Sequence, residues 1–452
     1  MRTCRSANTA KSLQENGTMH DPARRTITEL AAALGSGELK PSEVIDACLA
    51  QADACESDVR AWAHLGADNA RMAARLLDQI SSTGPLYGVP FGIKDIIETS
   101  DMPTGYGTPI YHHHQPARDA ACVALLREAS GVCLGKTVTT ELAHFHPGKT
   151  RNPHGLTHTP GGSSSGSAAA VAACMVPVAL GTQTTGSVLR PASYCGVYGF
   201  KPSFGDVSRS GVMECVSSFD TVGWFTRSVA DVEIVRQALV RIPFVPLQKP
   251  ATTSLRVGLF RGPDWAEAED YTKELLEGAA SKLAKAGANV SDVASPDGFG
   301  DIATHHRTIA GYEFARAITW ERTQRAPLLS PKLVDGRCAD GLASTYEQYA
   351  EAQSALVRQR AQYAQMMEAY DVLLTPSAPG EAWSGLGATG VPTFNTAWTA
   401  LHVPALSAPA FSGPSGMPVG LQLVGKFRQD AALLGAAETV CAALDVEIVR
   451  GV

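Results

Sequence analysis

Two turns rich in serine and glycine flank an alanine-rich run in the stretch TPGGSSSGSAAAVAACMVPVALGTQTTGS, which covers residues 159–187. A serine hydroxyl becomes a nucleophile when a base accepts its proton, and glycine lets backbone N–H groups approach a reacting atom closely. Residues 167–175 are strong helix formers, and VPVALG after them has the apolar character of a buried strand. A flexible Gly/Ser linker would not lie between two core elements, so the hydroxyls and N–H groups are candidate catalytic groups.

Two general motifs could explain parts of this stretch. Gly181 and Gly186 have the spacing of a phosphate-binding loop, but Ser187 occupies the position where that motif needs lysine. The segment GSSSG at 162–166 matches the G-x-S-x-G elbow of serine hydrolases, with Ser164 as nucleophile. That elbow requires a preceding strand, whereas RNPHGLTHTP is rich in turn residues. The histidines that could complete its triad are His305, His306 and His402.

Composition narrows the class of protein. The chain has 452 residues, of which 44% are hydrophobic and 18% charged, so it can bury a large core. A net charge of -6 and the lack of a basic cluster argue against a nucleic-acid partner, and no apolar run is long enough to span a membrane. Ten cysteines without C-x-x-C pairs suit reduced thiols, which predicts a cytoplasmic location. Residues 1–25 are polar, lack the apolar core of a secretory signal, and are expected to form a flexible tail.

Helix and strand patterns alternate along residues 26–452. Helices are expected at 26–55, with a break at 35–37, and at 63–80, 265–287 and over most of 305–370. Short apolar strands are expected in GPLYGVPFGIKDII, LRVGLF, YDVLLTP and GMPVGLQLVG, and a loop at 241–254. This alternation predicts one large α/β domain with helices on both faces of a sheet.

Several of these segments together resemble one family. The run PGGSSSGSAAAVAA…VALGTQTTGSVLRPASYCGVYGFKPSFG is similar to the signature of the amidase signature family of serine hydrolases, and so are YGVPFGIKDII, LGKTVTTELA, YDVLLTP and GMPVGLQLVG. The resemblance covers most of residues 26–440. It implies the amidase signature fold, with a mixed sheet, a signature core at about 85–230 and a variable substrate-pocket region at about 300–400.

The resemblance also implies a Ser–cisSer–Lys triad and assigns its members here. The nucleophile is Ser187, the relay serine is Ser163 after a cis peptide bond from Gly162, and the lysine is Lys94 of GIKD. Burial of Lys94 among apolar strand residues would disfavour its charged form and lower its pKa from about 10.4 toward a value that suits a general base. Asp95 is expected on the opposite face of the strand, where it would not keep Lys94 protonated.

The family pattern further implies an oxyanion hole formed by backbone N–H groups of Thr184, Thr185, Gly186 and Ser187. Arg190 matches the family's arginine, which either braces the loop or faces a substrate carboxylate, and Gly162 and Ser164 are likewise expected to bind substrate or brace the loop. The sequence departs from the commonest pattern at three positions. Gln183 replaces an aspartate, and Thr185 and Ser165 each replace a glycine, which leaves the subfamily and the pocket shape open.

Other conspicuous residues have plainer interpretations. The histidines at 112–114 lack acidic or cysteine partners at metal-site spacing, so a surface loop is expected and no metal site. His144 and His146 could line the pocket or be structural. Cys195 is expected in the core. Phe394 and Trp398 could form a wall of an acyl pocket, but the core is the favoured position.

These observations lead to a functional hypothesis. The resemblance implies an amidohydrolase without a cofactor that acts on linear amides of small molecules, with water as co-substrate and an acyl-enzyme on Ser187. Carbamate (urethane) and ester substrates stay open, as does a homodimer. Of the charged residues at 300–400 only Arg307 and Glu313 are weighed as possible contacts of the acyl group, and we expect a neutral acyl group. The alternative is the A-type subunit of a glutamine-dependent amidotransferase that acts with a partner.

Overall fold

Eleven strands form one mixed sheet in the computed structural model, which describes residues 21–80 and 84–451. Their order across the sheet is β1-β3-β2-β4-β6-β5-β10-β11-β9-β7-β8. Parallel pairing joins β2 to β3 and β4, and β7 to β8 and β9, while the other neighbouring pairs are antiparallel. The strands are β1 (Trp62–Leu65), β2 (Pro90–Lys94), β3 (Val132–Thr137), β4 (Val178–Gln183), β5 (Tyr198–Lys201), β6 (Thr221–Thr226), β7 (Arg256–Leu259), β8 (Asn289–Asp292), β9 (Val372–Pro376), β10 (Ala405–Ser412) and β11 (Pro418–Val424).

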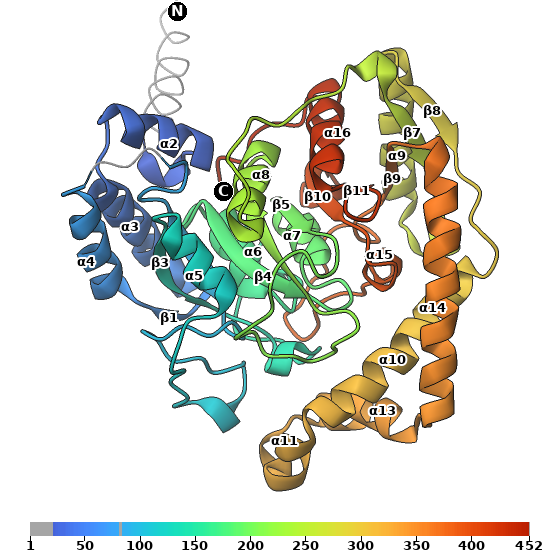
Figure 1. The fold of residues 1–452 in the computed structure, drawn as a ribbon, viewed down its shortest axis with the longest axis horizontal. Helices are drawn as coiled ribbons and strands as arrows, with labels where there is room; N and C mark the ends of the chain where they lie inside the picture. The colour runs from blue at the N-terminus through green and yellow to red at the C-terminus, as the bar shows by residue number, and fades with distance from the viewer. Residues whose placement is uncertain (1–20, 81–83, 452) are drawn as a thin grey trace, which may run out of the picture.

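Helices surround this sheet (Figure 1). They are α2 (Ile27–Ser36), α3 (Pro41–Val59), α4 (Ala67–Leu77), α5 (Ala121–Glu128), α6 (Ser165–Ala172), α7 (Leu189–Cys195), α8 (Val229–Val240), α9 (Asp270–Lys285), α10 (Ile302–Ala317), α11 (Thr319–Gln324), α12 (Pro331–Leu333), α13 (Ala339–Ala343), α14 (Tyr346–Met366), α15 (Thr396–Ala400) and α16 (Asp430–Ala443). None of the described helices is long and apolar enough to cross a membrane.

Alternating residues of the central strands enter two different hydrophobic cores. In β4, Val178 and Leu180 belong to a large core that includes residues of α5, α8 and α16, whereas Ala179 belongs to a second core with α4, α6 and α7. In β3, Cys133 joins the first core and its two neighbours join the second. Because side chains alternate with a period of two, the sheet is covered on both faces. The prediction of one large α/β domain is confirmed.

The N-terminal helices follow the predicted break closely. Thr26 caps α2 in a reciprocal capping box with Glu29, and Gly37 ends the helix in the left-handed region with φ 75°. The next helix begins with Pro41 at its first position, after Lys40 as its N-cap residue. Residues 1–20 of the expected tail lie outside the described residues, while Ala23 near its end is buried.

One expected helix is split by a strand. Residues 63–80 have helical spacing, but β1 occupies their beginning and pairs antiparallel with β3, so α4 begins only at Ala67. Trp62, at the start of β1, is buried against Met175 and makes the strand part of the second core. Tertiary packing therefore overrides the local helical pattern here.

The region between β8 and β9 leaves the sheet and is helical, as expected. In Figure 1 helices α10, α11, α13 and α14 form an arm at the lower right of the sheet, and α10 packs against α13, α14 and α15. Between α12 and α13 the chain makes one π-helical turn, η8 (Val334–Cys338). This arm falls within the region expected to vary among family members.

The site residues gather where two parallel strands end. Lys94 is the last residue of β2, and β4 beside it ends at Gln183. Helix α6 begins at Ser165, and α7 begins at Leu189 directly after β4. The carboxyl ends of parallel strands and the amino ends of the adjacent helices thus meet at one edge, the usual place for a site in an α/β fold.

The close approach of α6 to its neighbours yields a stability prediction. A Cβ atom at Gly166 would lie 2.3 Å from the backbone oxygen of Ala61 and 2.4 Å from the backbone nitrogen of Val138. Gly166→Ala should therefore destabilise the fold by roughly 1–3 kcal/mol or more, because backbone rather than a flexible side chain must move. We expect a thermal unfolding midpoint lower by several degrees, measured by circular dichroism.

Gly278→Ala is the matched control. Gly278 lies inside α9, and a Cβ there would meet nothing within 4 Å. The same substitution should leave stability unchanged or raise it by up to about 1 kcal/mol, because alanine favours the helix. Equal midpoints for the two variants would contradict this account of α6.

Candidate active site

Lys94 is completely buried and donates hydrogen bonds to two hydroxyls. Its Nζ lies 2.6 Å from Ser163 Oγ and 2.7 Å from Thr182 Oγ1. Burial disfavours the ammonium form and lowers the pKa of Lys94 to about 7. The fields of Cys215 and Asp220 act in the opposite direction but do not outweigh burial. A large fraction of Lys94 is therefore neutral near pH 7 and can accept a proton.

The nearest acidic residue in sequence does not pair with Lys94. Asp95 instead lies 3.4 Å from the Nζ of Lys136 and accepts a hydrogen bond from the backbone N–H of Gly105. The expectation that Asp95 points away from Lys94 is met. A direct carboxylate partner would have favoured the charged lysine, so this separation preserves its basicity.

Ser163 follows a cis peptide bond from Gly162, as the resemblance implied, and directly precedes the N-cap of α6. The neighbouring Ser164 forms no hydrogen bond with Lys94 in the described structure. Its Oγ donates to the backbone oxygen of Thr182 and accepts from the backbone N–H of Thr182, both at 3.2 Å. His306 and His402 bind other backbone carbonyls. The elbow hypothesis, with Ser164 as nucleophile, thus lacks a base at Ser164.

Ser187 lies in the 184–187 loop, and every backbone carbonyl of this loop accepts a hydrogen bond. The donors come from four separate segments, so the orientation of each peptide plane is fixed independently. For residues 184, 185, 186 and 187 in turn they are His306 Nε2 at 2.8 Å, Thr399 Oγ1 at 2.9 Å, the Arg190 backbone nitrogen at 3.1 Å and the Ser164 backbone nitrogen at 3.4 Å.

The N–H groups of the same loop are unpaired. Within the described part of the chain, the backbone N–H groups of Thr184, Thr185, Gly186 and Ser187 have no hydrogen-bond acceptor. A Cβ at Gly186 would lie 2.5 Å from Asn395 Oδ1, so only glycine fits at this point of the loop. Unpaired, fixed donors of this kind are what an oxyanion hole requires.

Arg190 braces the two turns. Its Nη2 donates to the backbone oxygen of Gly162 at 2.6 Å, and its Nε donates to the backbone oxygen of Thr389 at 2.7 Å. Burial lowers the pKa of Arg190 to about 10, so it stays charged at neutral pH. Its Nη1 is buried and has no partner among the described residues. Of the two roles considered, these contacts favour bracing.

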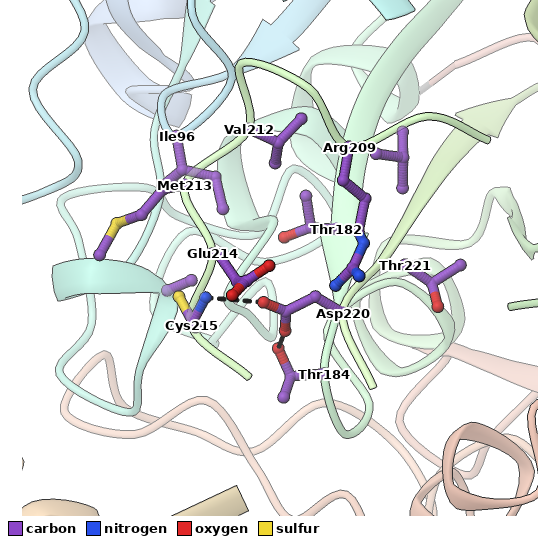
Figure 2. A pocket seen from close by; sticks show the side chains of 12 residues that line it. Ile96, Thr182, Thr184, Arg209, Val212, Met213, Glu214, Cys215, Asp220 and Thr221 are labelled. Atoms are coloured by element: carbon purple, nitrogen blue, oxygen red, sulfur yellow. Dashed lines mark hydrogen bonds between the residues drawn. The ribbon is translucent and has the colours of Figure 1, made fainter. Parts of the chain in front are cut away.

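The hydroxyl of Thr184 donates a hydrogen bond to the buried carboxylate of Asp220. Figure 2 shows the Asp220 carboxylate directed at the Thr184 hydroxyl, 2.5 Å away, and at the backbone N–H of Cys215. Burial raises the pKa of Asp220, whereas these hydrogen bonds act to lower it. His306 on the other side is neutral, because burial lowers its pKa to about 3, so its Nε2–H can donate to the Thr184 carbonyl.

Gln183, one of the departures from the family pattern, caps α7. Its Oε1 accepts from the backbone N–H groups of Val188 and Leu189 at 2.9 and 3.0 Å. Its Nε2 donates to Thr399 Oγ1 at 2.9 Å. The amide thus satisfies the helix N-terminus without adding a negative charge beside the 184–187 loop.

Two adjoining cavities open at these residues. The inner cavity is small, about 10 Å³, and it is lined by Ala143, His144, Phe145, Ser163, Thr184, Thr185, Gly186, Ser187, Arg190, Arg337 and Thr389. The outer cavity of about 320 Å³ shares His144, Phe145, Thr185 and Arg337 with it and continues along α10, η8 and α13. Ser163 and Ser187 therefore face one space that leads into a larger one.

The structure brings the residues of the two serine turns together. Lys94 donates to Ser163, and Ser163, the 184–187 loop, Arg190 and His144 line one cavity, while their catalytic roles stay predictions. Phe394 and Trp398 are buried, as expected, with Trp398 against Phe260, and Cys195 is buried too. The sequence analysis did not find Thr182, Asp220, Thr389 or Arg337. Of these four, only Thr182 could have been found from the sequence, because it lies in β4 within the same VALGTQTTGS stretch as Ser187.

In this large α/β fold a buried lysine with a lowered pKa donates to Ser163, and Ser163, Ser187 and the 184–187 loop line one cavity, an arrangement that suits nucleophilic catalysis. The family profile described as Amidase matches residues 43–434, and the chain therefore belongs to the amidase family. It is a hydrolase of the amidase signature family, an enzyme that acts on C–N bonds.

Known proteins resemble the chain over almost its full length. The A-type subunit of the glutamyl-tRNA(Gln) amidotransferase from Halothermothrix orenii is 30% identical, with 94% of this chain and 98% of the relative covered. Among solved structures, an amidase is 29% identical with a TM-score of 0.85, covering 93% and 99% of the two chains. The native peptide amidase of Stenotrophomonas maltophilia is 28% identical with a TM-score of 0.80, covering 93% and 97%.

The lowered pKa of Lys94 predicts a pH dependence of stability. In the unfolded chain Lys94 titrates near 10.5, so between pH 7 and 10.5 the unfolded state binds one more proton than the folded state. The free energy of unfolding of the wild type, relative to Lys94→Met, should therefore rise with pH across this window, by up to about 1.4 kcal/mol per pH unit. Urea unfolding of both proteins at several pH values measures the difference, and a constant difference would contradict the lowered pKa.

Proposed function

We propose that this chain is an amidase that hydrolyses the C–N bond of a small linear amide through an acyl-enzyme on Ser187. The observation that supports this most directly is the 2.6 Å hydrogen bond from the buried Lys94 Nζ to Ser163 Oγ, in a cavity that Ser187 also lines. In this proposal Lys94 is the general base and Ser163 relays the proton.

Acylation begins when Ser187 Oγ attacks the amide carbonyl carbon. The Ser187 proton passes to Ser163, and the Ser163 proton passes to the neutral Nζ of Lys94, so one proton arrives on the lysine as the C–O bond forms. Thr182 Oγ1, 2.7 Å from Nζ, can orient the amine for this transfer. The negative charge that develops on the carbonyl oxygen is stabilised by N–H groups of Thr184, Thr185, Gly186 and Ser187.

Collapse of the tetrahedral intermediate breaks the C–N bond. The lysine proton returns through Ser163 to the leaving nitrogen, which departs as a neutral amine or as ammonia. Water then attacks the acyl-enzyme, with the same relay accepting its proton, and the carboxylic acid product and free Ser187 are regenerated. The sequence of steps needs water and the substrate and no cofactor.

The same relay would serve other acyl substrates as well. Carbamates (urethanes) and esters offer the same carbonyl group to Ser187, so both belong in a substrate panel beside amides. We propose a small-molecule substrate, a cytoplasmic protein with no nucleic-acid or membrane partner, and a chain that acts alone or as a homodimer.

A fluorophosphonate probe tests the assignment of the nucleophile. We expect one adduct per chain, which peptide mapping places on Ser187, and no adduct in Ser187→Ala. Ser163→Ala should slow labelling roughly 100-fold or more, because the proton relay is lost. Ser164→Ala is the matched control: it should label within a few-fold of the wild type, with a stability loss of about 1–3 kcal/mol from the unsatisfied Thr182 backbone groups.

The opposite pattern would reverse the assignment. An adduct on Ser164, or fast labelling of Ser163→Ala beside slow labelling of Ser164→Ala, would restore the elbow hypothesis. Lack of any adduct on the folded protein would remove the amidase proposal and favour the alternative below.

The labelling rate should also depend on pH. The neutral form of Lys94 is the active base, so the second-order rate constant should rise with pH and level off above a midpoint near 7, where the pKa of Lys94 lies. Lys94→Ala should lose both the rate and this dependence. Stopped-flow or gel-based labelling between pH 5 and 9 provides the profile, and a rate that is flat across this range would contradict the role of Lys94.

A second candidate function is supported by the relatives themselves. Several curated relatives, 30% or 31% identical, are A-type subunits of glutamyl-tRNA(Gln) amidotransferases, and this chain covers nearly all of each. The alternative is thus the A-type subunit of a glutamine-dependent amidotransferase, with a partner chain. Glutamine hydrolysis that requires a co-purifying partner would support it, whereas turnover of small amides by the isolated chain would favour the amidase.

A further inference from the structure

Arg337 projects from the π-helical turn η8 into the wall shared by the inner and outer cavities. Its guanidinium lies 5.7 Å from the ring centre of Phe145 and 5.9 Å from that of Phe314. Its hydrogen bonding is sparse. Within the described residues, its one side-chain hydrogen bond is a 3.4 Å contact from Nη2 to Thr185 Oγ1, although a guanidinium has five N–H donors.

No carboxylate in the described chain forms an ion pair with Arg337. The nearest acid in sequence, Asp340, is engaged by Arg307, which donates to both of its oxygens. The Asp220 carboxylate accepts hydrogen bonds from the Thr184 hydroxyl and from the backbone N–H groups of Cys215 and Val216. Burial accordingly lowers the pKa of Arg337 relative to an ordinary arginine, with the fields of these acids acting against that shift.

The walls of the two cavities are also unbalanced in charge. Their lining includes four cationic side chains, Arg190, Arg307, Lys332 and Arg337, and one acidic side chain, Asp340. Asp340 is neutralised by Arg307 at the rim, and the bonds of Arg190 to Gly162 and Thr389 turn it toward the loop. Lys332 donates to the backbone oxygen of Gly387. Arg190 keeps one nitrogen, Nη1, without a partner among the described residues, so Arg337, with a single side-chain hydrogen bond, is the cation in these walls with the most donors available to a molecule in the cavity.

An anionic ligand group would supply the hydrogen-bond acceptors that the Arg337 guanidinium lacks. Keeping a guanidinium partly out of water without a carboxylate costs free energy, which an incoming anion offsets by forming charge-assisted hydrogen bonds. The planar fork of arginine fits a carboxylate in a bidentate manner, and the aromatic rings of Phe145 and Phe314 hold it in place.

The position of Arg337 indicates which part of the substrate carries the anion. The leaving nitrogen must lie on the side of Ser163, because Ser163 returns its proton. The outer cavity is lined by Arg337 but not by Ser163, and at about 320 Å³ it is far larger than the space at the serines. The acyl portion of the substrate therefore extends into the outer cavity.

We infer that Arg337 binds a carboxylate on the acyl portion of the substrate, so that the enzyme selects amides of acids with a second, anionic group. This inference rests on the proposed amidase function and specifies its substrate class. It differs from the expectation of a neutral acyl group, which considered Arg307 and Glu313 only. Arg307 is paired with Asp340, and Glu313 bonds to Ser218 and Tyr349.

Matched amides test the inference. Monoamides of C4 to C6 dicarboxylic acids should be hydrolysed with a higher kcat/KM than straight-chain monocarboxylic amides of the same length. A charge-assisted pair predicts a preference of roughly 10- to 100-fold at fixed ionic strength. Arg337→Ala should abolish this preference by losing more activity on the anionic amides than on the neutral ones, and Arg337→Lys should retain part of it. The exposed Arg316 of α10, whose guanidinium lies over Tyr312, supplies the control: Arg316→Ala should keep the wild-type ratio.

Two further measurements separate this inference from the proposed function. Fluorophosphonate should still label Ser187 in Arg337→Ala, which shows that the nucleophile is present, and Arg316→Ala should label at the wild-type rate. Calorimetric titration with glutarate, a dicarboxylate that needs no turnover, should show binding to the wild type and to Ser187→Ala, and at least 10-fold weaker binding to Arg337→Ala. Equal hydrolysis of neutral and anionic amides, or equal glutarate binding by wild type and Arg337→Ala, would overturn the inference even if Ser187 is labelled. Absence of labelling with normal glutarate binding would instead remove the amidase proposal alone.

Discussion

The site depends on a lysine kept in an apolar environment without a carboxylate partner. Lys94 contacts two hydroxyls, and Asp95, the acid next to it in sequence, forms an ion pair with a second buried lysine, Lys136. If Asp95 faced Lys94, the ammonium form would be stabilised and the base would be lost. The parallel pairing of β2 with β4 makes the arrangement possible, because it places the end of one strand beside Thr182 of the other.

Lys94 supplies a base, and the 184–187 loop supplies hydrogen-bond donors. Every carbonyl of the loop is paired, whereas its N–H groups have no acceptor among residues 21–80 and 84–451, so the loop offers donors without any need to rearrange during a reaction. The partners are the N-cap residue of α6, Arg190 of the adjacent α7, and residues of α10 and α15, which lie more than 100 residues further along the chain. The local geometry of four residues is thus a product of the whole fold.

Much of this arrangement could be predicted from the sequence, for identifiable reasons. The alternation of helix and strand indicated the α/β domain, and the two serine turns with GIKD are local patterns whose members are few residues apart. The strand β1 was missed because its identity depends on pairing with β3 and on the burial of Trp62. Asp220, Thr389 and Arg337 were missed because isolated residues in irregular segments have no period. Their roles arise only from contacts made over more than 30 residues of chain.

The helical arm between β8 and β9 has a consequence for how this enzyme could change. The arm departs from the sheet and returns to it, so residues lining the outer cavity can be exchanged without altering any strand register. The residues that line the outer cavity are nevertheless linked to the 184–187 loop through helix α10. His306 of α10 binds the Thr184 carbonyl, and the same helix contributes Ala303 and Arg307 to the outer cavity. Mutations that reshape the arm to admit a new acyl group will therefore tend to disturb the alignment of the 184–187 loop, which couples a gain in substrate range to a loss in turnover.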